Sequence, residues 1–301
     1  MDPVQAARTR LGGVIFSRVA GPEGAGRRER IHGAEGPRRF GPDDPIWRVH
    51  ADAAMFVGGI RALLLQSLHP LAMAAVDQHS GFRGDPWGRL QRTSTFLAET
   101  TFGTIQDADR AVAVVRAVHK HVRGTAPDGR PYAASDPELL RWVHVAEVDS
   151  FLRAHDRYGS GRLTTKERDL YVEQAAVTGE ALGATDVPRS VRELDETLAA
   201  YRPDLASTPA ARAATRFLLV HPPVPLTLRG PYGALAAAAV GLLPRWARWP
   251  LRVPWLPVAE STVVRATGIV VTSTIRWAMT PPESVTDPGS GPRFEAERAS
   301  T

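Results

Sequence analysis

The sequence contains no cysteine, and this absence excludes several kinds of site. Without thiols the chain can form no disulfide, no thiolate zinc site, no iron–sulfur cluster and no covalent haem link through a Cys-x-x-Cys-His motif. An iron site in this protein would therefore depend on histidine, on carboxylate or on a haem held without a covalent link.

Lysine is nearly absent as well. The 37 cationic side chains include only Lys120 and Lys166, the rest being arginine, and the net charge is +5. The arginines are scattered along the chain, whereas a nucleic-acid-binding protein gathers them on one stripe with stacking or base-reading residues between them. We therefore expect no nucleic-acid partner.

Long apolar runs are also missing. The most apolar stretch, residues 232–243, ends at Pro244 and falls short of the roughly 18 residues that a membrane-spanning helix needs. Residues 11–16 are apolar but too short for a secretory signal, and no convincing cleavage site follows them. We expect no transmembrane segment and a cytoplasmic location.

Glycine-rich phosphate loops, internal repeats and sustained period-two strand patterns do not occur in the sequence. Helical patterns continue from about residue 46 to residue 280 without a linker, which predicts an all-α fold with one multi-helix domain over residues 46–280. Glycine, proline and arginine dominate residues 21–45, so residues 1–45 are expected to form an irregular N-terminal arm. Residues 281–301 are expected to form a disordered tail.

Several helix boundaries can be predicted. A long pattern that starts at Trp47 is interrupted at Pro70, because proline removes a backbone donor and clashes with the preceding turn. Gly58 and Gly59 lie inside this pattern at a cost of about 1 kcal/mol each relative to alanine, which predicts a close contact there. Helix caps are expected at Asp107, Asp136 and Thr164, and helix ends at Gly124 and Gly183.

The segment from Arg116 to Arg123 contains the clearest candidate for a metal- or haem-binding residue. At about 100° per residue, His119 lies on one helix face with these two arginines, while His121 points nearly the opposite way. Four apolar positions are expected on the inward side, namely Val112, Val115, Val118 and Val122. A neutral imidazole beside guanidiniums suits ligation of a metal or haem iron in an anionic cofactor. A core histidine hydrogen-bonded to a neighbour would have the same spacing.

A second helix places Arg89, Arg92, Thr93 and Phe96 on one side. This spacing predicts an anion or oxygen-ligand site, although solvated arginines and a threonine bonded to its own helix fit it equally well. His69, with Gln66 one turn earlier, could line a cavity edge or bond to the kinked backbone.

A carboxylate metal site is not predicted. His144 shares a predicted helix with Asp136 and Glu147, but no His-x-x-x-His or Glu-x-x-His pair on one face completes a ligand set. We therefore expect no di-iron site.

Short motifs along the chain, taken together, resemble those of a known family. In order they are Gly41-Pro-Asp-Asp-Pro-Ile-Trp-Arg-Val-His50, Leu65-Gln-Ser-Leu-His69-Pro70, Arg89-Leu-Gln-Arg-Thr93, Phe102-Gly103, Arg116-x-x-His119-x-x-x-Arg123-Gly124, Asp136-Pro137-x-x-Leu-x-Trp142-Val-His144 and Leu182-Gly183. This series, over about residues 40–250, resembles the catalytic domain shared by rubber oxygenases (latex-clearing proteins) and the oxygenase of mycophenolic acid biosynthesis.

The resemblance implies an all-helical domain that holds a noncovalent haem b. It implies that His119 is the proximal iron ligand, with Arg116 and Arg123 beside it. It also implies that Arg89 and Thr93 lie on the opposite, oxygen-binding side of the haem.

Two positions depart from the family pattern. Rubber-cleaving members have a lysine where this chain has Arg92, and arginine stays protonated, so Arg92 would donate hydrogen bonds or pair with a carboxylate. The glutamate that those members use as a base upstream of this segment has no counterpart in residues 72–77. Both departures argue against cleavage of polyisoprene as the specific reaction.

Three hypotheses follow. The first is a haem b-dependent oxygenase that acts with dioxygen on a hydrophobic, isoprenoid-like small molecule. The second is a helical protein that binds haem or a lipid-like ligand without oxygen chemistry, which the missing lysine and glutamate favour. The third is a metal-independent scaffold in which His119 is a core residue. The sequence does not determine the oligomeric state.

Overall fold

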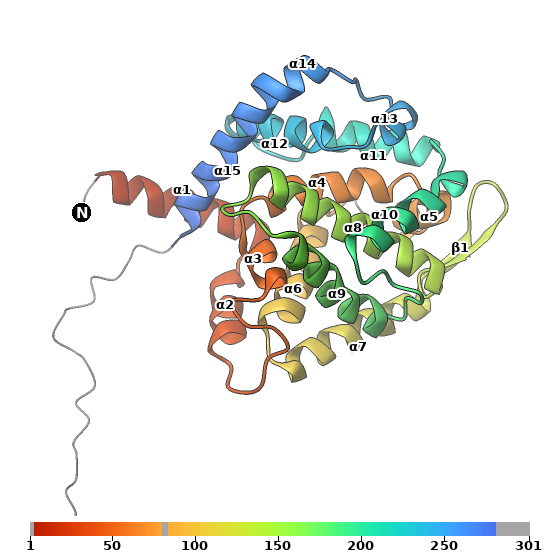
Figure 1. The fold of residues 1–301 in the computed structure, drawn as a ribbon, viewed down its shortest axis with the longest axis horizontal. Coiled ribbons are helices and arrows are strands. Elements are labelled where there is room, and N and C mark those ends of the chain that lie inside the picture. The colour runs from red at the N-terminus through yellow and green to blue at the C-terminus, as the bar shows by residue number, and fades with distance from the viewer. Residues whose placement is uncertain (1–2, 80–83, 281–301) are drawn as a thin grey trace, which may run out of the picture.

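The structure, a computed structural model, describes residues 3–79 and 84–280, and helices dominate it (Figure 1). The first helices are α1 (Pro3–Ala20), α2 (Gly24–Gly33), α3 (Pro45–Ala51), α4 (Met55–Gln66), α5 (Pro70–His79), α6 (Pro86–Phe102) and α7 (Ile105–His121). After the short strands β1 (Arg123–Thr125) and β2 (Pro131–Ala133) come α8 (Pro137–Tyr158), α9 (Thr165–Leu182), α10 (Val191–Ala200), α11 (Pro209–Leu219), α12 (Arg229–Gly241), α13 (Arg245–Leu251), α14 (Pro257–Ala259) and α15 (Arg265–Met279). The helical turns are η1 (Arg202–Asp204), η2 (Leu226–Leu228) and η3 (Glu260–Val264). The predicted all-α fold is confirmed.

Helices α4 and α8 cross the middle of the molecule and pack on each other (Figure 1). Helices α11 to α15 lie on one side of this pair, and α6, α7 and α9 lie on the other. Helix α8 begins as predicted, since the Asp136 side chain accepts a hydrogen bond from the Glu138 amide and Pro137 is its first residue.

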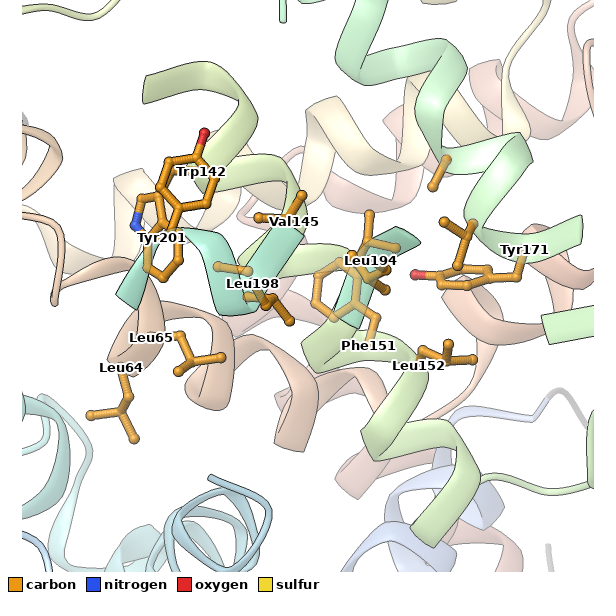
Figure 2. Close-up of a cluster of buried hydrophobic side chains, with 14 of the residues drawn as sticks. Leu64, Leu65, Trp142, Val145, Phe151, Leu152, Tyr171, Leu194, Leu198 and Tyr201 are labelled. Atoms are coloured by element: carbon orange, nitrogen blue, oxygen red, sulfur yellow. The ribbon is translucent and has the colours of Figure 1, made fainter. Parts of the chain in front are cut away.

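The main core lies where α4, α8, α9 and α10 meet (Figure 2). Trp142, Tyr171 and Leu194 are fully buried there. The indole of Trp142 donates a hydrogen bond of 3.2 Å to the carbonyl of Gln66 at the end of α4, so its one polar group is satisfied. Burying a large apolar side chain contributes about 1.5–3 kcal/mol, so this cluster fixes α4 against α8.

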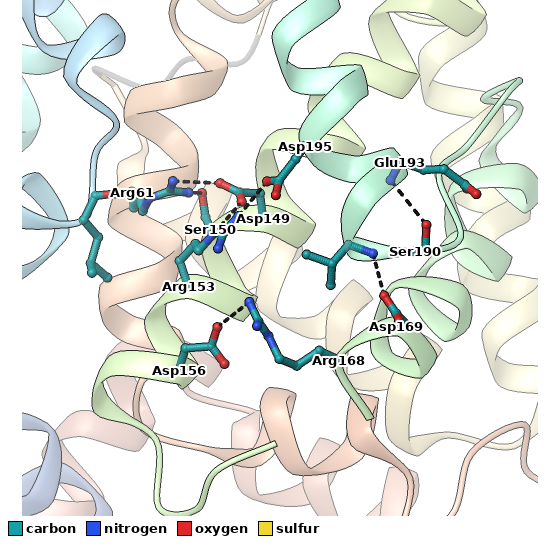
Figure 3. Close-up of polar contacts among 12 residues, drawn as sticks. Arg61, Asp149, Ser150, Arg153, Asp156, Arg168, Asp169, Ser190, Glu193 and Asp195 are labelled. Atoms are coloured by element: carbon teal, nitrogen blue, oxygen red, sulfur yellow. Dashed lines mark hydrogen bonds and ion pairs between the residues drawn. The ribbon is translucent and has the colours of Figure 1, made fainter. Parts of the chain in front are cut away.

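A buried ion pair crosses the same interface (Figure 3). Arg61 of α4 lies 2.7 Å from Asp149 of α8, and both side chains are only 4 % exposed. The Arg61 guanidinium also donates to the Ser150 hydroxyl and to the Leu242 carbonyl, and Asp149 accepts a second bond from Arg153. Because every partner is present, these charges are compensated inside the protein.

The predicted irregular arm over residues 1–45 is wrong for the described residues. Two helices form there, and α1 packs on α15 and α6 while α2 packs on α6. A Cβ on Gly12 would clash with the carbonyl oxygen of Ala278, so α1 and the last turn of α15 approach closely. The glycines lie mostly between or at the ends of helices, and tertiary contacts outweigh their low helix propensity. The predicted tail, residues 281–301, lies outside the described residues.

The expected end of α7 at Gly124 is also wrong. The helix ends at His121, and residues 123–125 pair antiparallel with residues 131–133. The cap of α7 is Thr104, whose hydroxyl accepts from the Asp107 amide, rather than Asp107 itself. The other caps are confirmed: Thr164 forms a capping box with Glu167, and Gly183 ends α9 with a positive φ.

The predicted break at Pro70 is confirmed. It separates α4 from α5, which bend by 107° relative to each other. In the described part of the chain no single helix is long and apolar enough to cross a membrane. Taken together, the bent pair α4 and α5 reaches the length and the apolar composition of a membrane-spanning segment. Most apolar residues of both helices are buried inside the protein, as is usual for core helices.

Candidate functional site

Helices α6 and α7 form an antiparallel hairpin that sets the geometry of the candidate site. The turn between them, Gly103 and Thr104, is short, and the helices pack on each other. Arg89 precedes the turn by almost as many residues as His119 follows it, so at 1.5 Å per residue both lie about 20 Å from the turn. The predicted residues of the two helices therefore lie at the same level.

His119 lies on the inward face of α7, as predicted. Ala108, Ala111 and Val112 on this face are buried, whereas His121 is exposed. The His119 Nδ1 atom is buried and has no hydrogen-bond partner, while its Nε2 atom keeps accessible surface and meets no partner among the described residues. Desolvation by burial lowers the pKa of His119, so the imidazole is neutral and Nε2 can act as an electron-pair donor.

One apolar neighbour does not face inward as expected. Val118 is 56 % exposed, because it lies about 100° around the helix from His119 and beyond the buried stripe. Val115 and Val122 are half-buried. The environment of His119 is therefore less apolar on one side than the spacing predicted.

Arg116 and Arg123 lie on either side of His119 in the sequence, but the predicted shared helix face is wrong for Arg123, because α7 ends at His121 and Arg123 begins β1. The Arg116 guanidinium donates to the Ala181 carbonyl near the end of α9, and Arg123 donates to the Lys120 carbonyl. Neither forms an ion pair with a carboxylate among the residues that the structure describes. Both charges remain available for an anionic group of a ligand.

Arg89 and Thr93 share one face of α6. On the opposite face Gln91 donates to the Arg18 carbonyl of α1, and Thr95 accepts from Arg27 of α2. Arg89 is half-buried, and desolvation, followed by the charge of Arg92, lowers its pKa. The Thr93 hydroxyl is exposed and donates 3.0 Å to the Arg89 carbonyl, which is the helix-bonded arrangement that the spacing left open.

Arg92 lies apart from this face. It is largely exposed and pairs at 3.4 Å with Asp85, the residue that caps α6. The structure thus brings Arg89 and Thr93 together but directs Arg92 toward a carboxylate, as expected for a guanidinium that replaces a lysine.

A chain of polar side chains leads from α6 into the protein. The Thr101 hydroxyl lies 2.8 Å from Nδ1 of His50, and Nε2 of His50 lies 3.4 Å from the Tyr171 hydroxyl. Burial lowers the pKa of His50 to about 3. Burial raises the pKa of Tyr171, and the nearby Glu147 carboxylate of α8 raises it further.

Glu147 is a functional candidate that the sequence analysis considered only as a metal ligand. Burial raises its pKa to about 7, yet its carboxyl oxygens keep accessible surface and have no partner among the described residues. His144, one turn earlier, contacts Gly179 of α9, and burial lowers its pKa to about 4. Only their tertiary surroundings distinguish these residues.

Apolar side chains of the two central helices are accessible near Glu147. Leu63 of α4 is 37 % exposed, and Val143 of α8 is 36 % exposed. Gly59 of α4 also faces open space, since a Cβ built on it would meet no atom within 4 Å. Within the described structure neither α6 nor α7 packs extensively on α4 or α8. Accessible apolar side chains of the central pair of helices therefore lie near one protonatable acid.

The comparison with protein families identifies the family of this chain. A family described as "ER-bound oxygenase mpaB/B'/Rubber oxygenase, catalytic domain" matches residues 47–273. The chain belongs to this oxygenase family. No curated protein and no solved structure shows significant similarity to it. The resemblance predicted from the motifs is thus confirmed, and the match contains His119, Arg89 and Glu147.

The residues present fit a haem that has one protein ligand. The neutral His119 offers an open Nε2 atom, and the orphaned Nδ1 shows that protein contacts alone do not satisfy this imidazole. No group of three or more metal-binding side chains occurs in the described part of the chain. A porphyrin supplies four ligands itself and needs only an axial histidine.

His69 has a structural role among the described residues. It is buried at the break between α4 and α5, and its Nδ1 lies 3.5 Å from the Ala72 amide. Gln66 donates to the Val143 carbonyl instead. The structure thus favours hydrogen bonding at the kinked backbone for His69.

Proposed function

We propose that this oxygenase-family protein is a haem b-dependent oxygenase that acts with dioxygen on a hydrophobic small molecule. The observation that carries the proposal is His119, a neutral imidazole with an open Nε2, between two arginines that have no carboxylate partner. Haem b, when bound at Nε2, would supply the iron that binds and activates dioxygen.

The two arginines beside His119 in the sequence would neutralise the cofactor. Arg116 and Arg123 each hold only a backbone carbonyl, so they can turn to the two carboxylates of a porphyrin at little cost. On the facing helix, Arg89 would donate hydrogen bonds to the oxygen substrate as negative charge develops on it, and Thr93 would assist once its hydroxyl leaves the Arg89 carbonyl.

The remaining groups favour an apolar substrate. Leu63 and Val143 offer accessible apolar surface, and Phe96 lies on the same face of α6 as Arg89. Glu147, with a pKa raised to about 7, would hold a proton that it can release near neutral pH. An isoprenoid-like molecule would match this lining.

The absorption spectrum tests the cofactor. Protein expressed with added haem precursor should show a Soret band, and His119→Ala should lose it because the iron ligand is gone. His121→Ala is the matched control, since His121 lies two residues away and points outward, and it should keep the band. A colourless wild-type protein would overturn the proposal.

A second candidate is a protein that binds haem or a lipid-like ligand without turnover. It is favoured by Arg92, which pairs with Asp85, and by Thr93, whose hydroxyl is bonded to its own helix. Dioxygen consumption with an alkene or terpenoid separates the two, because a carrier shows spectral binding without consuming oxygen.

A further inference from the structure

The C-terminal third of the described chain has an unusual charge balance. Residues 205–280 contain eight arginines and a single acidic residue, Glu260. Glu260 is not free, since it lies 2.5 Å from the buried guanidinium of Arg248. Arg276 pairs with Asp52 of the loop before α4. The other arginines of this region have no carboxylate partner among the described residues.

The same region exposes large apolar side chains. Trp249 of α13 is 89 % exposed, Val258 of α14 is 76 % exposed and Val270 of α15 is 65 % exposed. Further exposed members are Trp255, Leu256, Val263 and Ile269. Helices α13 and α14 and the first half of α15 lie along the upper edge of the molecule in Figure 1. Clustered apolar groups at this exposure mark an interaction surface.

Arginines are interspersed with these apolar groups. Arg245, Arg252 and Arg265 are exposed, and the Arg245 guanidinium lies 3.9 Å from the ring centre of Trp255. We name the exposed residues of α13 to α15 and the loop between α13 and α14 the Trp/Arg surface. It combines protruding tryptophan and aliphatic side chains with unpaired cations and presents no free carboxylate in the described structure.

A cationic cleft adjoins the Trp/Arg surface. Its volume is about 570 Å³, and Arg157, Arg162 and Arg265 line it together with Leu242. A smaller neighbouring cleft of about 210 Å³ shares Arg157 and Arg265 and is lined by Trp255. Anionic groups near the surface would find three guanidiniums there that no described carboxylate neutralises.

We propose that the Trp/Arg surface docks this protein on an anionic lipid bilayer. Tryptophan and aliphatic side chains enter the boundary between headgroups and acyl chains, while arginines attract the negatively charged headgroups. A second copy of the chain does not suit this surface, because a symmetric dimer would set the unpaired arginines of both copies against each other. The contact is made from one side of the bilayer, without a spanning helix.

The proposal does not depend on the proposed function, because it needs neither haem nor turnover. If both hold, the surface would let the protein collect a hydrophobic substrate from the bilayer. Binding to vesicles can fail while the Soret band is present, and the reverse can also occur, so the two proposals are tested separately.

Vesicle cosedimentation of the full chain tests the docking. Vesicles of phosphatidylcholine mixed with phosphatidylglycerol should bind the protein, and vesicles of phosphatidylcholine alone should bind it at least about tenfold more weakly. Arg245→Glu with Arg252→Glu should reduce binding to the anionic vesicles by more than about tenfold. The charge-matched control is Arg189→Glu, just before α10, with Arg192→Glu in its first turn, which should leave binding nearly unchanged.

The apolar contribution has its own variants. Trp249→Ser with Val258→Ser should weaken binding about tenfold or more, because less apolar surface enters the bilayer. Val114→Ser on α7, where the valine is 59 % exposed but lies outside the Trp/Arg surface, should have no effect. Brominated lipid should quench tryptophan fluorescence, and Trp249→Phe should reduce the quenching while the protein stays bound.

Three outcomes would overturn the proposal. Equal binding to neutral and anionic vesicles, or no binding to either, contradicts it. Loss of vesicle binding on addition of inorganic phosphate at constant ionic strength would show a site for free anions instead. A dimer in light scattering that Trp249→Ser dissociates would show that this surface joins two copies of the chain.

Discussion

Histidine and glutamate side chains near the candidate site are kept neutral by burial rather than by partners. His119, His50 and His144 have lowered pKa values, and Glu147 has a raised one, with desolvation as the main cause each time. Neutral groups of this kind can bind iron or move a proton. Paired charges such as those of Arg61 and Asp149 serve the fold instead.

Glu147→Gln should change stability in a pH-dependent way. The raised pKa of Glu147 means that wild-type stability is full below the unfolded-state pKa of about 4.5 and falls as the pH rises toward 7. Urea unfolding should therefore show Glu147→Gln to be more stable than wild type by up to about 3 kcal/mol at pH 8, with little gain at pH 4. The exposed Glu173→Gln on α9 is the control. An equal gain at both pH values would contradict the assignment.

At the scale of elements, the two adjacent glycines of α4 have different surroundings. A Cβ on Gly58 would lie 2.8 Å from Cδ1 of Phe151 and 3.2 Å from its Cα, so α4 and α8 approach too closely there for a side chain. Gly59 faces open space. The close contact predicted for both glycines is thus confirmed for Gly58 alone.

Alanine at these two positions should have opposite effects. Gly58→Ala should destabilise the protein by about 1–3 kcal/mol, because Phe151 and the α8 backbone must move. Gly59→Ala should stabilise it by about 0.5–1 kcal/mol through helix propensity. Urea unfolding of both variants gives the comparison, and a loss of stability in Gly59→Ala would show that its open side is filled.

At the scale of the whole molecule, the candidate site and the Trp/Arg surface lie in different regions. The candidate site residues lie on α6, α7, β1 and α8, whereas the Trp/Arg surface lies on α13 to α15, on the other side of the central pair from α6 and α7 (Figure 1). Cytoplasmic location remains a prediction, and so do the domain over residues 46–280 and the tail after it.

The buried histidines should make the whole protein sensitive to acid. His50 and His144, with pKa values lowered to about 3 and about 4, stay neutral when folded but gain protons below about pH 6.5 when unfolded. Their contribution to stability is therefore complete above pH 6.5 and is lost as the pH falls. The free energy of unfolding should drop by a few kcal/mol between pH 6.5 and pH 4. His144→Gln should flatten this slope, and an unchanged slope would contradict the prediction.

The sequence by itself determined the all-α fold, the caps at Asp136 and Thr164 and the face on which His119 lies, because these depend on spacing and on neighbours within a few residues. The helices of the N-terminal segment escaped prediction, since glycine-rich stretches fold there only by packing on α6 and α15. Tertiary structure alone decided that Glu147 is desolvated, that Arg92 turns to Asp85 and that Gly58 rather than Gly59 is in close contact. Burial and contact depend on helices far away in the sequence, and no local pattern records them.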